Sequence, residues 1–241
     1  MAQEFFKNFP NIQYKLSDGK VITIKDFFRK SRIEQESVTS LVEYTTYELE
    51  EGDRPDTVAS KIYGNGDLHW TLYLVNDLDN YFDWFKTSQE FEEYIKQKYE
   101  GYLINANNTS EIIDSSSKFL LGEKVKTTES EGIVIKVDPT HKRIGVKPIT
   151  GDFGAGSVSE GTITGESSGK SFSINFATHH RDGICYYYKG DLKRNQFENG
   201  YQAKTFWEEE WEKNEEKRKI KIIKPAKIQQ IVSAFEKVMK S

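Results

Sequence analysis

The sequence has a single cysteine, Cys185, and no long uninterrupted run of apolar residues. One cysteine cannot build a framework of internal disulfides, so the composition gives no sign of an oxidising compartment. The first ten residues, MAQEFFKNFP, lack a charged segment followed by an apolar one, and no stretch approaches the roughly 18 apolar residues of a membrane-spanning helix. We therefore expect neither a classical export signal nor a transmembrane segment.

An excess of positive charge is also missing. The 241 residues carry a formal net charge of −4, so the chain lacks the global positive field that non-specific nucleic-acid binding needs. Apolar residues are scarce: counted with Gly but without Tyr they make up about 38% of the chain, against roughly 45–50% in ordinary globular proteins. We therefore do not expect DNA wrapping, and the chain is poor in apolar residues for a core.

Aromatic residues are abundant, with 15 Phe, 13 Tyr and 4 Trp. Their large and partly polar surfaces are enriched in the cores of protein interfaces. Together with the low apolar content, they predict an extended subunit that completes its burial against partner proteins.

The sequence contains fragments of known catalytic motifs, but none of them is complete. The segments 152–154 (Asp-Phe-Gly) and 180–182 (His-Arg-Asp) match kinase fragments, but their order is the reverse of that in kinases, and no phosphate-cradling Gly-rich loop is present. Metal-ligating residue types gather at 179–185, but neighbouring side chains of an extended segment point to opposite faces, and no second ligand pair occurs at finger-like spacing. The sequence predicts no catalytic residue, no metal site and no cofactor.

The N-terminal region, residues 1–43, combines an aromatic arm with a short strand and a helix. The arm holds four large apolar side chains: Phe5, Phe6, Phe9 and Tyr14. A turn at 17–20 precedes a β-prone run at 21–24. Such side chains are hard to bury within so small a local unit. Docking on a partner is one explanation, and folding back on the chain's own core is the other.

Residues 44–85 read as one compact strand–helix–helix–strand unit. Its expected elements are a strand at 44–49, a helix from Pro55 that stops at Gly64, a second helix at 67–76 and a final extended piece at 81–85. Residues 86–104 form a helix that starts with the capping-box pattern Thr87-Ser88-Gln89-Glu90.

The rest of the chain changes character twice. A polar linker at about 105–117 opens an inserted domain at 105–178, where short β-branched runs between Gly turns predict a small antiparallel barrel or a sandwich. Strands and amphipathic helices return in the C-terminal region, 179–241, with an expected strand at 184–188 and a turn at 189–191. The predicted fold class is α+β.

The segment from Tyr44 to Asn76 resembles a LysM module. The resemblance is carried by the turn Glu51-Gly52-Asp53, by Ile62-Tyr63-Gly64 at the end of the first helix, and by Leu74-Val75-Asn76 at the end of the second. It implies a βααβ fold. It also leaves open a peptidoglycan-binding function in a cell-wall-associated or lytic protein.

A wider resemblance is to the LysM-containing baseplate wedge subunit of T-even-like contractile-tailed bacteriophages. It is carried by Arg54-Pro55, by Leu68-His69-Trp70, by Trp84 ahead of the capping box, and by Lys219-Ile220-Lys221-Ile222-Ile223 before the terminal helix. Segment 105–178 departs from this pattern and reads as an insertion. The resemblance implies a non-enzymatic structural protein of the virion tail baseplate, made in the host cytoplasm.

The implied partners are other baseplate wedge proteins, including those of adjacent wedges that it helps to join into a ring, with the sheath-initiating subunit as a further candidate. Neither nucleic acid nor membrane is expected as a partner. Apolar and aromatic anchors often dominate protein interfaces, and the predicted interface residues are Phe5, Phe6, Phe9, Tyr14, His69, Trp70, Trp84, Trp207, Ile228 and Phe235.

Overall fold

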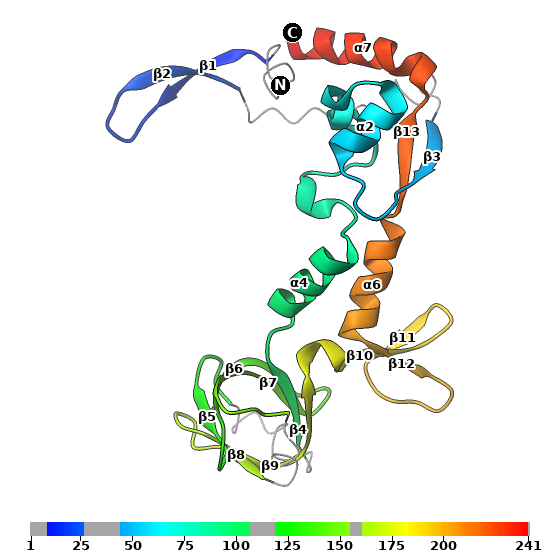
Figure 1. Cartoon of the computed structure of the whole chain (residues 1–241). Helices are drawn as coiled ribbons and strands as arrows, with labels where there is room; N and C mark the ends of the chain where they lie inside the picture. The colour runs from blue at the N-terminus through cyan, green and yellow to red at the C-terminus, as the bar shows by residue number, and fades with distance from the viewer. Residues whose placement is uncertain (1–8, 27–43, 107–118, 155–160, 241) are drawn as a thin grey trace. The chain divides into compact units, whose positions relative to one another are not determined.

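The computed structural model describes residues 9–26, 44–106, 119–154 and 161–240 (Figure 1). The chain divides into two compact units, which we call the terminal unit (residues 1–87 and 214–241) and the barrel unit (residues 88–213). The described residues confirm a mixed α/β chain that contains a closed β-barrel. Within these ranges, every helix is too short or too polar to cross a membrane.

The described part of the terminal unit begins with an antiparallel hairpin of β1 (Asn11–Lys15) and β2 (Val21–Lys25). The predicted turn at 17–20 joins the two strands, and Gly19 supplies the left-handed backbone conformation that this turn needs, with φ at 85°. The strand expected at 21–24 is confirmed. Residues 11–15, interpreted from the sequence as part of an arm, instead form the partner strand of the hairpin.

A second two-stranded sheet pairs β3 (Tyr44–Glu48) with β13 (Lys219–Ile223) in antiparallel fashion, with Lys219 opposite Glu48. The two strands lie side by side in Figure 1 although they come from opposite ends of the sequence. The predicted strand at 81–85 is wrong, because Tyr81–Asp83 form the 3-10 helix η3. The Asn80 side chain accepts a hydrogen bond from the Phe82 backbone N–H, and such a local bond competes with a strand.

Short helices cover the inner face of this sheet. They are α2 (Pro55–Tyr63), the 3-10 helix η2 (Gly66–His69) and α3 (Trp70–Val75). The predicted end of the first helix is confirmed at Gly64, whose φ of 70° is the left-handed cap. The C-terminal 3-10 helix η6 (Pro225–Lys227) leads into α7 (Ile228–Lys240). One core cluster contains Leu49, Val58, Ala59, Leu72, Trp84, Phe85, Ile220 and Ile222, and a second contains Ile223, Ile228 and Ile231.

The barrel unit begins with α4 (Ser88–Lys98), which confirms the start of the helix expected over 86–104. Its predicted end is wrong, because the chain passes into strand β4 (Tyr102–Ala106). Six antiparallel strands then close into a barrel in the order β4-β7-β6-β5-β8-β9, so the barrel alternative is confirmed over the sandwich. The strands are β4 (Tyr102–Ala106), β5 (Lys124–Lys126), β6 (Glu131–Asp138), β7 (Arg143–Thr150), β8 (Thr162–Gly165) and β9 (Ser171–His179). The first barrel strand thus starts ahead of the domain boundary expected at 105.

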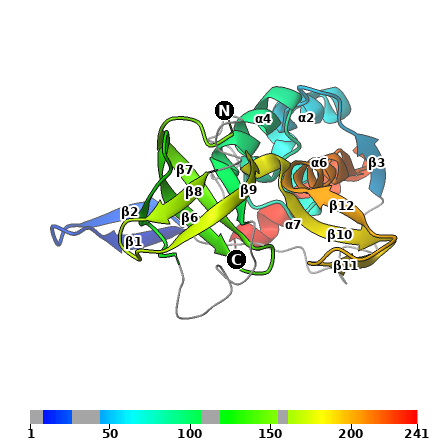
Figure 2. The same ribbon diagram turned by 90° about the horizontal axis from the view of Figure 1, so that it is seen from below.

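After the barrel, the 3-10 helix η5 (His180–Asp182) leads to a three-stranded sheet of order β11-β10-β12. Its strands are β10 (Ile184–Lys189), β11 (Leu192–Arg194) and β12 (Gln202–Thr205), followed by α6 (Phe206–Glu216). The strand and turn expected at 184–191 are confirmed. In Figure 2 this sheet lies beside α6.

Candidate interaction surfaces

Three of the predicted interface side chains are buried, and two lie outside the described residues. Phe5 and Phe6 fall in the latter group. Phe9, Trp84 and Ile228 are almost fully buried, with Trp84 only 2% exposed. The indole Nε1 of Trp84 donates a hydrogen bond of 2.8 Å to the Asp53 carbonyl, so both its apolar surface and its polar atom are used inside the terminal unit. We therefore assign Trp84 and Ile228 to the core rather than to an interface.

Trp70 and Phe235 are brought together by the fold. Their ring centroids lie 4.4 Å apart, which joins α3 to α7, and both side chains remain half-buried. His69 precedes Trp70 and is also half-buried, with Nδ1 2.9 Å from the Gly66 carbonyl oxygen. These three residues form a partly exposed aromatic patch on the terminal unit.

Tyr14 and Trp207 lie on separate surfaces. Tyr14 is 43% exposed on the β1–β2 hairpin. Trp207 belongs to the barrel unit, where it stacks on Trp211 with ring centroids 5.3 Å apart and donates from Nε1 to the Glu92 carboxylate at 3.0 Å. Much of Trp207 is thus engaged in holding α6 against α4.

The most exposed aromatic side chain of the terminal unit among the described residues escaped the sequence analysis. Phe82 is 79% exposed, and the neighbouring ring of Tyr81 is also exposed, with the centroids 6.5 Å apart. The turn that carries them is held by the Asn80 side chain and by Lys86, whose Nζ donates to the Phe82 carbonyl at 2.6 Å. Asn80, a good helix-capping residue, was the one signal for a turn here instead of a strand.

The barrel unit also carries exposed apolar side chains that the sequence analysis did not select. Phe197 is 71% exposed and Leu192 is nearly as exposed, both in the segment that connects β10 with β12. Leu121 precedes the barrel strand β5 and is likewise exposed. Such short strands and loops have no periodic pattern that would separate an exposed from a buried apolar residue.

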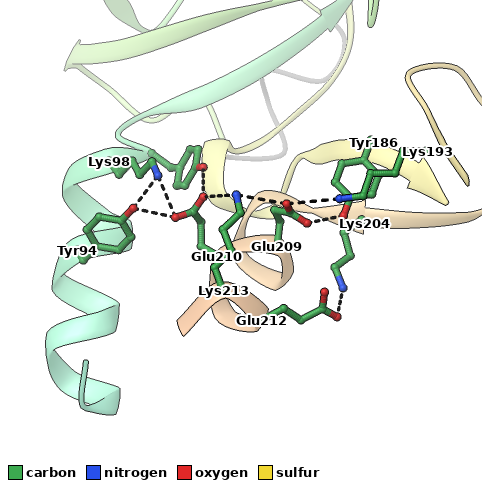
Figure 3. A network of polar contacts seen from close by, with 10 residues as sticks. Tyr94, Lys98, Tyr186, Lys193, Lys204, Glu209, Glu210, Glu212 and Lys213 are labelled. Atoms are coloured by element: carbon green, nitrogen blue, oxygen red, sulfur yellow. Dashed lines mark hydrogen bonds and ion pairs between the residues drawn. The ribbon is translucent and has the colours of Figure 1, made fainter. Parts of the chain in front are cut away.

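A network of charged and phenolic groups holds the helices of the barrel unit together (Figure 3). Its centre is the buried carboxylate of Glu210 on α6, which accepts hydrogen bonds from Tyr94 at 2.7 Å, Lys98 at 2.9 Å and Tyr99 at 3.1 Å. Burial alone would raise the pKa of Glu210, but the hydrogen bonds from Lys98 and Tyr94 outweigh burial and lower the pKa to about 2. The carboxylate is therefore ionised and fully partnered.

The same network continues from α6 to the sheet. Glu209 accepts a hydrogen bond from the Tyr186 hydroxyl on β10 and lies 3.2 Å from the Lys213 ammonium. Lys204 on β12 is buried and pairs with Glu212. Because these charges are paired within the unit, the network stabilises the packing of α4, α6 and the sheet.

His180 is buried beside this network and is uncharged at neutral pH. Burial lowers its pKa to about 4, against a weak opposing hydrogen bond with the Glu100 carbonyl, and the nearby charges of Lys136 and Arg143 add to the lowering. Over the described part of the chain, no three His, Cys, Asp or Glu side chains converge as a metal site would require. The 179–185 segment is interrupted by η5 rather than extended.

Comparison with known proteins gives a match over the N-terminal part of the chain. Residues 4–117, slightly less than half of the chain, match a family described as "Base plate wedge protein 53". The baseplate wedge protein gp53 of Enterobacteria phage T4 is 28% identical over 85 residues, which cover 35% of this chain and 43% of that protein. The match thus spans less than half of the relative's length. It supports the resemblance to phage baseplate wedge subunits.

Proposed function

We propose that this chain is a structural subunit of a phage tail baseplate wedge. The observation that carries the proposal is the match of residues 4–117 to the baseplate wedge family, with the T4 wedge protein as a relative. This relative favours assembly over the peptidoglycan-binding alternative. A structural role in the virion tail requires binding surfaces and no catalytic machinery.

The finer role that we propose is contact with neighbouring wedge proteins, including those of adjacent wedges, so that wedges are joined into the baseplate ring. The sheath-initiating subunit is a further candidate partner. In the terminal unit, helices α2 and α3 follow strand β3 along the chain, and the second strand of the sheet is β13, which comes from near the other end of the sequence. We propose that this unit, which resembles a LysM module in sequence, serves as a protein-contact module.

The surfaces best suited to such contacts are the aromatic ones of the terminal unit. Phe82 offers a large ring on a turn that is already fixed by hydrogen bonds, so binding costs little side-chain and loop ordering. Trp70 and Phe235 offer a second, partly exposed pair. Aromatic anchors of this kind often contribute about 2 kcal/mol or more to an interface.

The test is co-assembly of the purified full-length chain with the wedge proteins of its source phage, followed by size-exclusion chromatography with light scattering. We expect a stable complex with at least one wedge protein. The variant Phe82→Ser should weaken that complex by about tenfold or more, equivalent to about 1.4 kcal/mol. The control Leu121→Ser removes an exposed apolar side chain from the barrel unit and should leave the complex unchanged. A full-length chain that ignores every wedge protein would contradict the proposal.

A further inference from the structure

The two edges of the β3–β13 sheet are treated differently by the fold. On the β13 edge, the Asn76 side-chain amide donates to the Lys221 carbonyl and accepts from the Lys221 backbone N–H, both at 2.8 Å. The Tyr63 hydroxyl likewise donates to the Ile223 carbonyl and accepts from the Ile223 N–H, both at 3.1 Å. Two side chains thus occupy the backbone groups that an added strand would use.

On the β3 edge, the corresponding groups are open. The N–H of Leu49 bonds to the Arg218 carbonyl, so the odd-numbered residues of β3 face β13 and the even-numbered ones face outward. Thr46 and Glu48 are exposed, and no partner for their outward backbone groups is found among the described residues. Such an edge is a template for pairing with another strand.

The β1–β2 hairpin, in turn, needs a further strand or a packed face to be stable. Its ladder bonds join even-numbered residues, as the flanking bonds Leu16 N–H to Lys20 O and Asp26 N–H to Pro10 O show. One face therefore carries four apolar side chains: Ile12, Tyr14, Ile22 and Ile24. A two-stranded hairpin is only marginally stable by itself, and a third strand or a packed face is needed for it to persist.

Antiparallel addition of the hairpin to β3 matches both faces. In an antiparallel pair, the residues whose backbone N–H and C=O groups point outward from the two strands lie opposite one another and form hydrogen-bonded pairs. Gln13 of β1, or Thr23 of β2, would then lie on the same face of the enlarged sheet as the exposed Thr46 and Glu48. The apolar face of the hairpin would then lie on the same side as Tyr47, next to the buried Ile220. Parallel addition would place the apolar face on the solvent side.

Charge favours the same pairing. The hairpin segment 11–25 carries three Lys and one Asp, whereas β3 carries Glu48 and no basic residue, and Glu50 and Glu51 follow it. We propose that the open edge of β3 accepts, in antiparallel orientation, the β1–β2 hairpin of a second copy of this chain. Among the described residues, the hairpin and β3 belong to separate two-stranded sheets.

The contact is heterologous, because each copy donates a hairpin and accepts another. Repetition of a heterologous contact builds a ring if the rotation closes and a filament if it does not. The inference concerns copies of this chain alone, so its failure would leave the wedge assignment standing.

Two full-length edge variants test the proposal. Thr46→Pro removes an outward N–H from the acceptor edge, and Gln13→Pro with Thr23→Pro removes outward N–H groups from both edges of the donor hairpin. Proline is tolerated on an edge strand where the N–H points away from the ladder. The control Thr46→Val keeps the N–H and the β-branched shape.

Mass is measured by light scattering across a concentration series, and folding by circular dichroism. We expect the wild type and Thr46→Val to associate beyond the monomer, each proline variant alone to stay at least tenfold weaker, and an equimolar mixture of the two proline variants to form a dimer. The mixture has one intact donor and one intact acceptor, so its dimer separates a trans contact from a general loss of folding. A wild type that stays monomeric at every concentration, or a mixture that gives no dimer, would overturn the proposal.

Discussion

The barrel and the β3–β13 sheet deal with their strand edges in opposite ways. The barrel pairs each of its six strands on both sides, so it leaves no edge to protect. The β3–β13 sheet has two edges, and among the described residues side chains cover the β13 edge, through Asn76 and Tyr63, but not the β3 edge. The barrel is thus complete in itself, whereas the β3 edge has the backbone pattern of a template for an added strand.

The two regions also differ in how the chain builds them. The barrel strands lie within one stretch, 102–179, and three of their six pairs join strands that are consecutive in sequence. The terminal unit needs residues from both ends of the described chain, because β3 pairs with β13. A substitution in the core of the terminal unit should therefore lower the stability of that unit without lowering the stability of the barrel unit.

The largest expected effect is that of Trp84→Ala. The change removes a buried ring and the hydrogen bond to the Asp53 carbonyl, and large-to-small changes of this kind cost about 3–5 kcal/mol. We expect the unfolding transition of the terminal unit to move to lower denaturant while that of the barrel unit stays in place. Chemical denaturation followed by circular dichroism and Trp fluorescence measures both.

The matched control is Phe172→Ala, which removes a fully buried ring of the barrel core. It should shift the other transition by a similar amount. If both variants shift a single common transition, the two units are not energetically separate and the comparison fails.

Acid should weaken the barrel unit through Glu210. Its pKa in the folded chain is about 2, below the ordinary value of 4.5, so its contribution to stability is present above pH 4.5 and is lost as the pH falls towards 2. The slope in that window is at most about 1.4 kcal/mol per pH unit for one proton. Thermal unfolding of Glu210→Gln across pH should lack that slope, and an unchanged slope would contradict the assignment.

His180 should make the stability of the barrel unit depend on pH in a neighbouring window. Its pKa in the folded chain is about 4, below the ordinary 6.5, so the unfolded chain takes up the proton first as the pH falls. Stability is thus fully present above pH 6.5 and declines between 6.5 and 4. His180→Phe, measured by the same unfolding series, should flatten this limb while the Glu210 limb remains.

Loss of the β13 edge cover should have a smaller effect. Asn76→Ala removes the hydrogen bonds with Lys221 and one with the Leu72 carbonyl, at about 0.5–1.5 kcal/mol each before water replaces part of the loss. We expect a total of about 1–2 kcal/mol by denaturation. Tyr63→Phe removes only a hydroxyl and should lower the free energy of unfolding by less. An Asn76→Ala variant as stable as the wild type would show that the hydrogen bonds on the β13 edge do not stabilise the fold.

The smallest stability effect is expected for Phe82→Ser. The side chain is 79% exposed, so the free energy of unfolding should change by no more than about 0.5 kcal/mol. The same variant is expected to weaken co-assembly, so a large loss of stability in denaturant unfolding would mean that Phe82 serves the core instead of an interface.

Local signals in the sequence predicted local structure well. The end of α2 at Gly64, the start of α4 in the Thr87–Glu90 pattern and the hairpin turn at 17–20 were predicted correctly. Each of these features depends on only a few adjacent residues. The partner of β3 could not be predicted in this way, since it lies near the other end of the chain. Nothing in the run of aromatics at 81–85 distinguishes the exposed Phe82 from the buried Trp84, because tertiary packing decides which ring is covered.

The open β3 edge is tested most directly by amide hydrogen exchange resolved to single residues in the dilute full-length chain. We predict fast exchange at Thr46 and Glu48 and strong protection at Lys221 and Ile223, whose N–H groups are held by Asn76 and Tyr63. Raising the protein concentration should slow exchange at Thr46 and Glu48. Equal protection of all four amides in the dilute chain would contradict the account.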